Sequence, residues 1–393
     1  MLSTYNFRSE LQFFVVRLFF ASINFEIFSP VIKDFSAAKY FGLLYILVSL
    51  FTPIGKLFTT KNIAKPLVAV LLLFFTMVAS SFISMSMNVS FWNSTIFSNI
   101  IFCWLLFNHS LRDPRVFKEG LLWFVYSSAV LGVLAFFGVG VELNLEGRLS
   151  IFGDNANSIG AKMAVAAIFL LVYCLNNYKN HGIRSPWLLL LLIPIVFLLL
   201  ATASRLAFLM LAAGFVLFII LKPTKHFYTK LIYLLIGVVV SVSLWNVILE
   251  QNVLFSRLME TTQSGNVSGR DKIWDVFINV IEENPIIGIG FTGHYNYKIP
   301  GYYKVMSPHN VFIEVLLYSG VVGLMFFLNF LYFLFKSSLF CLRKYKLLGP
   351  LLMSIAMLGV IMSGQVLGFK IFWVIAAYIL SSQYSSFNLE RNR

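Results

Sequence analysis

The residues of this sequence that are best suited to chemistry are three arginines and one histidine, each near a long apolar stretch. Arg148, Arg205 and Arg270 lie near such stretches, and His309 follows a Ser-Pro pair at the start of another. The planar guanidinium fork of arginine binds the paired oxygens of phosphate and diphosphate groups. A neutral imidazole accepts a proton from a hydroxyl group near pH 7. These residue types favour the attack of a hydroxyl on a substrate that carries a diphosphate leaving group.

Each of these residues also has a purely structural interpretation. Arg205 would extend its side chain from the end of a span to the membrane interface. Arg148, Arg270 and the further arginine Arg257 would be solvated loop residues. His309 would be a hydrogen-bonded histidine at the membrane surface. The residue types alone therefore leave both interpretations open.

Two further charged residues lie inside apolar stretches, namely Lys162 and Glu314. Charged side chains inside a membrane are costly and need a partner. A hydrogen bond to a neighbouring helix explains each of them as well as a catalytic role does.

The segment Gly288-Ile-Gly-Phe-Thr-Gly293 matches the GxGxxG pattern of dinucleotide-binding proteins. That pattern requires a preceding strand and a following helix, whereas this segment lies in a predicted loop. We interpret it as a flexible turn beside the bilayer. The scattered histidines, cysteines and carboxylates lack metal-site spacing, so neither a metal nor a cofactor is expected.

The elements that must position these residues are membrane helices. Of the 393 residues, 59% are apolar and only 12% are charged, and the mean hydropathy is +0.84. Soluble proteins have about 45–50% apolar and about 25% charged residues, so a water-soluble enzyme is excluded. The net charge of +14 is spread in small groups without a basic stripe, which argues against a nucleic-acid partner.

The predicted fold class is all-α, a polytopic membrane protein with about 12 transmembrane helices in a single integral membrane domain, residues 1–393. A span needs roughly 20 apolar residues. Lysines and arginines concentrate in the loops that alternate on one side, so both termini are predicted to be cytoplasmic. The expected spans are 11–30, 40–57, 66–86, 92–108, 119–140, 158–176, 187–201, 204–221, 229–248, 309–335, 347–363 and 369–382.

One large loop, residues 249–308, is predicted on the outer side of the membrane. Within it Ser268-Gly-Arg-Asp271 resembles a capping box, and the apolar residues of 273–281 recur at helical spacing. Pro285 ends this pattern. We expect a short amphipathic helix at the membrane surface.

Several of these segments, taken in order, resemble the O-antigen ligase/polymerase superfamily. They are Ser268-Gly-Arg-Asp-Lys-Ile-Trp274, Glu283-Asn-Pro-Ile-Ile-Gly-Ile-Gly290 and Pro308-His-Asn-Val-Phe-Ile-Glu-Val-Leu-Leu-Tyr-Ser-Gly-Val-Val-Gly323. Upstream, Arg148 to Asn157 and Ala203-Ser-Arg205 follow the same order of features. The direct resemblance covers roughly residues 140–340.

The resemblance implies a GT-C-like glycosyltransferase of the bacterial inner membrane with its active face in the periplasm. The donor would be a glycan on undecaprenyl diphosphate. A polymerase passes the glycan to another lipid-linked repeat unit, whereas a ligase passes it to lipid A–core. The motifs are common to both, and we predict a polymerase because polymerases are the more numerous kind. A chain-length regulator or other assembly proteins would be partners.

The resemblance also implies roles for the candidate residues. His309 would be the catalytic base that deprotonates the acceptor hydroxyl. Arg205 and Arg270 would bind the donor diphosphate, and Arg148 would assist. Inversion at the anomeric carbon without a metal follows by analogy.

Two other classes of protein compete with this interpretation. A transporter or flippase of a lipid-linked or anionic substrate would also have many spans and buried charges. Transporters often contain inverted repeats and broken helices at mid-membrane depth, whereas no repeat is visible here and the candidate arginines and histidine cluster on the outer side. A non-catalytic assembly protein would need no particular set of histidine and arginines.

Overall fold

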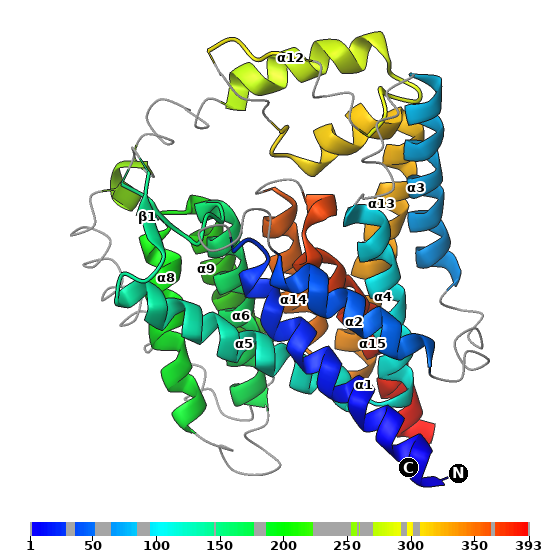
Figure 1. Cartoon of the computed structure of the whole chain (residues 1–393), viewed down its shortest axis with the longest axis vertical. Coiled ribbons are helices and arrows are strands. Elements are labelled where there is room, and N and C mark those ends of the chain that lie inside the picture. Colours follow the sequence, from blue (N-terminus) through cyan, green and yellow to red (C-terminus); the bar gives the residue numbers. More distant parts are fainter. Residues whose placement is uncertain are drawn as a thin grey trace. The chain divides into compact units, whose positions relative to one another are not determined.

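The computed structural model (Figure 1) shows a mostly helical chain. Its contacts divide it into two compact units. Unit one comprises Met1–Pro53, Arg112–Gly265 and Cys341–Gly359, and unit two comprises Ile54–Leu111, Asn266–Phe340 and Val360–Arg393. The structure describes residues 2–28, 36–51, 64–84, 95–144, 147–176, 186–222, 253–257, 259, 270–291, 297–301, 307–362 and 366–391.

Helices occupy eleven of the twelve predicted spans, and the stretch 229–248 lies outside the described residues. The helices and 3-10 turns are α1 Leu2–Ser22, η1 Ile23–Phe25, α2 Ala37–Leu50, α3 Ala64–Ile83, α4 Thr95–Arg112, α5 Arg115–Phe136, α6 Ala156–Asn176, η4 Pro186–Leu191, α8 Leu192–Ala201, α9 Arg205–Leu221, α12 Arg270–Glu283, α13 Val311–Tyr345, α14 Gly349–Ile361, η6 Val366–Gly368 and α15 Lys370–Arg391.

Four ranges of the described residues are long and apolar enough to cross a membrane. They lie in α3, α5, α6 and α13, and α2, α9 and α14 are among the shorter apolar helices. The membrane character of the chain is thereby confirmed, whereas the number of twelve spans stays a prediction. The four ranges are Lys65–Ile83, Arg115–Phe136, Ala156–Cys174 and Val311–Tyr345.

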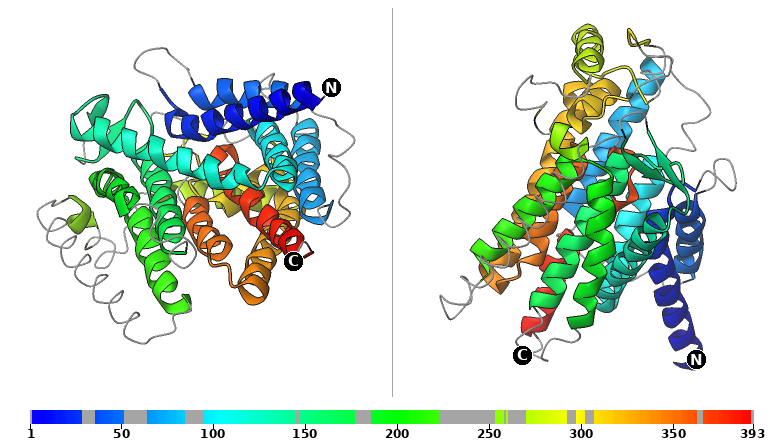
Figure 2. Two further views of the ribbon diagram at one scale, coloured as in Figure 1. Left: turned by 90° about the horizontal axis from the view of Figure 1, so that it is seen from below. Right: turned by 90° about the vertical axis from the view of Figure 1, so that its left-hand side faces the viewer.

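Unit one is built around α6, and 83% of the most apolar stretch of this helix is buried within the protein. It packs against α5, α8 and α9, while α5 also packs against α1 and α8. The helices α1 and α2 lie side by side (Figure 2). Phe19 of α1 stacks on Tyr45 of α2, and the ring of Phe20 packs onto Gly120 of α5, where a Cβ would leave it no room.

A small hairpin in unit one adds to the predicted all-α fold. Strand β1, Val141–Leu143, pairs antiparallel with β2, Leu149–Ile151, with Glu142 opposite Ser150. The sequence analysis treated this region only as a loop. Its strands are too short to show the alternating pattern on which a strand prediction depends.

In unit two, α15 packs against both α4 and α13. The ring of Tyr384 meets that of Phe107 of α4 edge to face, and Trp373 stacks on Phe330 of α13. The Asn99 amide of α4 donates to the carbonyl oxygen of Gly368 at 2.9 Å. These contacts place the C-terminal helix within the core of the unit.

Helix α13 is two helical segments joined at Gly320, where φ is 60° and ψ is −161°. The sequence analysis expected residues 309–335 to form one tilted span. The range is helical and apolar, as predicted, but it breaks at Gly320. The second segment, 321–345, by itself exceeds the roughly 20 residues that a span requires.

The break in α13 receives the turn that follows α12. The Ile289 amide donates to the carbonyl oxygen of Leu317 at 2.7 Å, and the Val321 amide donates to that of Pro285 at 2.9 Å. At Gly288 and Gly320, which both have positive φ, an added Cβ would lie only 2.4 and 2.2 Å from backbone atoms of the other segment. The expected flexible turn at 288–293 is therefore, over its described residues, tightly packed.

The predicted amphipathic helix is present as α12, which ends before Pro285 as expected. Ile273, Phe277 and Val280 form its buried face. The capping residue Ser268 lies outside the described residues. The location of α12 at a membrane surface stays a prediction.

Helix α12 runs parallel to the first segment of α13. Trp274 contacts Pro308 just before α13, and Pro285 contacts Val321 just after the break. Because both pairs advance in the same direction along the chain, the two segments lie side by side (Figure 1). The buried face of α12 is thus held close to the segment that carries His309.

Candidate functional site

Arg148 lies at the start of β2, and its side chain is almost fully enclosed, with an exposed fraction of 7%. Its Nε donates to the carbonyl oxygen of Thr202 at 3.1 Å, and a terminal nitrogen donates to the Oδ1 of Asn157 at 2.6 Å. The Oδ1 of Asn144 accepts a hydrogen bond from the Arg148 amide and shapes the hairpin turn. Arg148 therefore ties the hairpin to α6 and to the end of α8.

The backbone breaks between α8 and α9, where the predicted spans 187–201 and 204–221 meet. Ala203 has a φ of 46°, and Ser204 precedes the first turn of α9 in an extended conformation. Gly160 of α6 packs against this break, since its Cβ would lie 2.9 Å from that of Ser204. The close helix contact places the start of α9 beside the polar end of α6.

Two arginines engage the backbone at this break. Arg205 donates a hydrogen bond of 2.8 Å to the carbonyl oxygen of Arg257, and Arg257 donates one of 3.3 Å to the carbonyl oxygen of Ala203. Both side chains remain partly exposed. Two guanidinium groups at one backbone break concentrate positive charge, which attracts an anion such as a diphosphate. The sequence analysis ranked Arg257 low, because nothing local to residue 257 shows that it meets Arg205.

Lys162 and Asp154 form a buried ion pair in the same unit. The distance from Nζ to Oδ2 is 2.8 Å, and the two side chains are only 3% and 5% exposed. Ser158 also donates to Oδ2, and the Asn155 amide donates to Oδ1. The partner that Lys162 needed inside its predicted span is thus a carboxylate eight residues earlier, at the start of α6.

His309 lies in unit two, directly before Asn310, whose side chain caps α13 by accepting from the Phe312 amide at 2.9 Å. His309 has a φ of 50°, in the left-handed region that ordinary residues seldom adopt. Its Nδ1 is buried and has no hydrogen-bond partner among the residues that the structure describes. Such a nitrogen is available to a ligand.

Burial, together with the smaller effect of the positive charge of Arg270, lowers the pKa of His309 to about 4. Both effects disfavour the imidazolium form. His309 is therefore neutral at pH 7. A neutral imidazole is the form that accepts a proton.

Helix α12 supplies two residues beside His309. The indole Nε1 of Trp274 donates to the carbonyl oxygen of Pro308 at 2.8 Å and so holds the backbone just before His309. Arg270 at the start of α12 donates to the carbonyl oxygen of Met362 at 3.3 Å. Trp274 belongs to a segment that the sequence analysis singled out, but its bond to Pro308 has no local sequence signal.

Glu314 lies in the first turn of α13, with an exposed fraction of 3%. A carboxylate at this place is stabilised by the positive end of the helix dipole. Its position is consistent with a structural role at the start of the helix.

The candidate residues fall into two groups. Arg148, Arg205 and Arg257 belong to unit one, whereas Arg270 and His309 belong to unit two. The first group offers positive charge and hydrogen-bond donors at the break between α8 and α9. The second offers a neutral base next to an arginine.

Comparison with known proteins bears on the region that contains most of these residues. Residues 187–328 match the model of a family described as O-Antigen ligase. This range includes Arg205, Arg257, Arg270 and His309, and it begins after Arg148. A search of curated proteins found no match for the chain. The match over this region supports the resemblance to the O-antigen ligase/polymerase superfamily.

Proposed function

We propose that the protein is a membrane glycosyltransferase that acts on the periplasmic side of a bacterial inner membrane. It transfers a glycan from an undecaprenyl-diphosphate-linked donor to a hydroxyl group of an acceptor sugar. The observation that carries this proposal is the neutral, partly buried imidazole of His309 beside Arg270, within the region that matches the family. Glycosyl transfer from a lipid diphosphate needs a base for the acceptor and positive charge for the leaving group.

In the proposed reaction, His309 takes the proton of the acceptor hydroxyl. The hydroxyl oxygen forms a bond to the anomeric carbon of the donor sugar, and the bond from that carbon to the diphosphate oxygen breaks. The diphosphate leaves with the electron pair, and Arg205 and Arg270 stabilise its charge. The attack comes from the face opposite the leaving group, so the anomeric configuration inverts. In this proposal the residues of the chain supply the chemistry, and no metal takes part.

For Arg148 we propose a positioning role. Its guanidinium group is enclosed and donates to Thr202 and Asn157. It assists donor binding by holding the α8–α9 break in place, so that Arg205 begins its helix at a fixed point.

A polymerase is the form of this activity that we propose, with a lipid-linked repeat unit as the acceptor. A ligase with lipid A–core as the acceptor is the second candidate, and the description of the matching family favours it. The match supports glycan transfer over the transporter or flippase considered above. The donor, the acceptor and the bilayer are the partners in either case, and a chain-length regulator would join a polymerase.

The experiment that distinguishes these functions is a lipopolysaccharide gel of a deletion strain of the source bacterium, together with analysis of its undecaprenyl-linked glycans. Core that carries a single repeat unit indicates a polymerase. Bare core with long chains held on undecaprenyl diphosphate indicates a ligase. If neither these pools nor the strain's other surface polysaccharides change, the proposed function is wrong.

A second experiment tests the role of His309. The deletion strain is complemented with His309→Ala or with His181→Ala as a control for loss of a histidine. The first variant should bind the lipid-linked donor but form no product, and the second should restore the wild-type glycan. Full activity of His309→Ala would exclude this residue as the base.

A further inference from the structure

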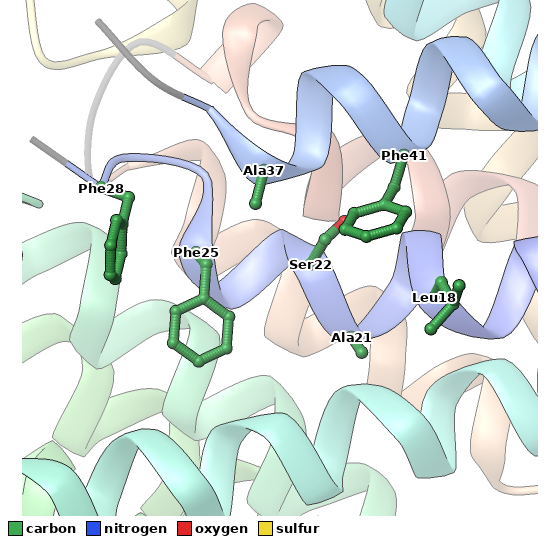
Figure 3. A pocket seen from close by; sticks show the side chains of 7 residues that line it. All are labelled: Leu18, Ala21, Ser22, Phe25, Phe28, Ala37 and Phe41. Carbon is green, nitrogen blue, oxygen red and sulfur yellow. The ribbon is translucent and has the colours of Figure 1, made fainter. Parts of the chain in front are cut away.

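An apolar groove of about 390 Å³ lies between α1 and α2 in unit one (Figure 3). This volume is within the range of about 300–1,000 Å³ that small-molecule sites occupy. Among the described residues of its wall, Ser22 carries the one hydroxyl group, which donates to the carbonyl oxygen of Phe19 at 2.7 Å. The lining residues are Leu18, Ala21, Ser22, Phe25, Phe28, Ala37 and Phe41.

An aromatic cluster closes one end of this groove. The ring centroid of Phe28 lies 4.6 Å from that of Phe152, and the centroid of Phe25 lies 6.4 Å from it. Phe152 directly follows β2 and has a φ of 54°, and its ring packs against Gly140. The groove therefore ends against the hairpin that carries Arg148.

A continuous set of contacts leads from this hairpin to the arginine pair. Arg148 at the other end of β2 bonds the carbonyl oxygen of Thr202, which lies at the break where Arg205 and Arg257 meet. The contacts thus link one end of β2 to the arginine pair and the other end to the apolar groove. A molecule with an anionic head and a long apolar chain matches this arrangement, with the head at the arginine pair and the chain in the groove.

We propose that the groove between α1 and α2 binds part of the isoprenoid chain of the donor lipid, with the diphosphate directed toward the arginine pair. This inference rests on the proposed function, since it assigns a binding site to the lipid of that substrate. An isoprenoid chain offers methyl groups and double bonds to the aromatic cluster, where apolar contact with large rings contributes strongly to binding. Binding of the chain would hold the diphosphate close to its site before reaction.

The test uses the full-length protein in lipid nanodiscs and two donors that carry the same glycan diphosphate. One donor has an undecaprenyl chain, and the other has a butyl chain that is too short to fill the groove. Ala21→Trp and Ala37→Trp fill the groove. Leu47→Trp is the matched control, because Leu47 is an exposed α2 residue that does not line the groove.

The groove variants should raise KM for the undecaprenyl donor at least about tenfold, the loss expected when two or three methylene groups are excluded from an apolar site. KM for the butyl donor should not change, and Leu47→Trp should behave like the wild type with both donors. The proposal would be overturned if the groove variants raised KM equally for both donors, or if Leu47→Trp raised KM as much as they do.

A photo-crosslinking measurement separates failure of this inference from failure of the proposed function. A prenyl diphosphate with a diazirine on its chain should label residues 18–28 or 37–41 of the wild type. Excess undecaprenyl diphosphate should reduce the label, whereas excess phospholipid should not. Labelling elsewhere, or competition by phospholipid, would contradict the groove assignment. Absence of turnover with correct labelling would contradict the proposed reaction alone.

Discussion

The indole Nε1 of Trp274 donates a 2.8 Å hydrogen bond to the carbonyl oxygen of Pro308. This bond joins α12 to the residue that precedes His309, whose φ of 50° costs conformational energy on the order of 1–3 kcal/mol. An external constraint of this kind stabilises a backbone conformation that the local sequence disfavours. Trp274 thus positions the proposed base by holding the backbone that precedes His309.

Trp274→Phe should lower kcat for glycan transfer by about two- to tenfold, because one hydrogen bond contributes about 0.5–1.5 kcal/mol and its loss frees the backbone at His309. The KM for the donor should change little, since the ring still packs in α12. The matched control is Trp187→Phe, at a tryptophan with an exposed fraction of 73%. Steady-state kinetics check both variants. A wild-type kcat in Trp274→Phe would show that this bond does not position the base.

The pH dependence of transfer should reflect His309. Its pKa of about 4 predicts that kcat/KM is constant near neutral pH and falls as the pH decreases toward 4, because protonation removes the base. Arg270→Gln removes a positive charge that disfavours the imidazolium, so the acid limb of kcat/KM should move to higher pH. Lys272→Gln, at an exposed neighbouring residue of α12, is the control for lost charge.

A bound diphosphate would compensate the charge of Arg270. The acid limb of kcat, which reports the enzyme–substrate complex, should therefore lie at higher pH than that of kcat/KM in the wild type. The two limbs should lie closer together in Arg270→Gln. Identical pH profiles of the wild type and Arg270→Gln would contradict the electrostatic link between these residues.

Arg257 should contribute to donor binding together with Arg205. Hydrogen bonds to charged groups contribute about 1.5–3 kcal/mol, so Arg257→Gln should raise KM for the donor about 10- to 100-fold. Arg257→Lys should restore this loss only in part, because an ammonium group lacks the guanidinium fork. Arg115→Gln, at an exposed arginine of unit one, should leave KM unchanged. Normal KM in Arg257→Gln would assign the Arg205–Arg257 contact to structure alone.

The buried pair of Lys162 and Asp154 should affect stability. Lys162→Met or Asp154→Asn leaves one polar group without its partner and should cost about 3–5 kcal/mol in the free energy of unfolding. The double variant Lys162→Met/Asp154→Leu should recover much of this loss, since no buried charge remains. Thermal unfolding in one detergent checks the three proteins. Single variants as stable as the wild type would show that the pair contributes little.

Several features of the fold could be predicted from the sequence because they depend on local patterns. Long apolar runs indicated membrane helices, and the spacing of apolar residues between 273 and 281 indicated α12 with its end before Pro285. The two predicted spans 187–201 and 204–221 placed a break where α8 and α9 meet. Hydropathy, helical periodicity and helix-breaking residues act over a few turns, so the sequence itself records them.

The sequence alone also pointed to the superfamily and to four candidate residues, because motifs and their order can be recognised without a structure. It left Arg257 and Trp274 without a role, and it treated Gly288 as part of a flexible turn. Each of these residues owes its role to a partner that is distant in the chain: Arg205, Pro308 and Gly320, respectively.

Tertiary structure decided these relationships for a physical reason. Gly320 accommodates the break in α13 because the backbone of Ile286 packs where a Cβ would be. Trp274 holds Pro308 because α12 lies beside the first segment of α13. Close backbone contact and hydrogen bonds across long chain separations depend on how whole helices pack. The amino-acid sequence determined which helices and chemical groups this protein has, and their packing determined which groups meet.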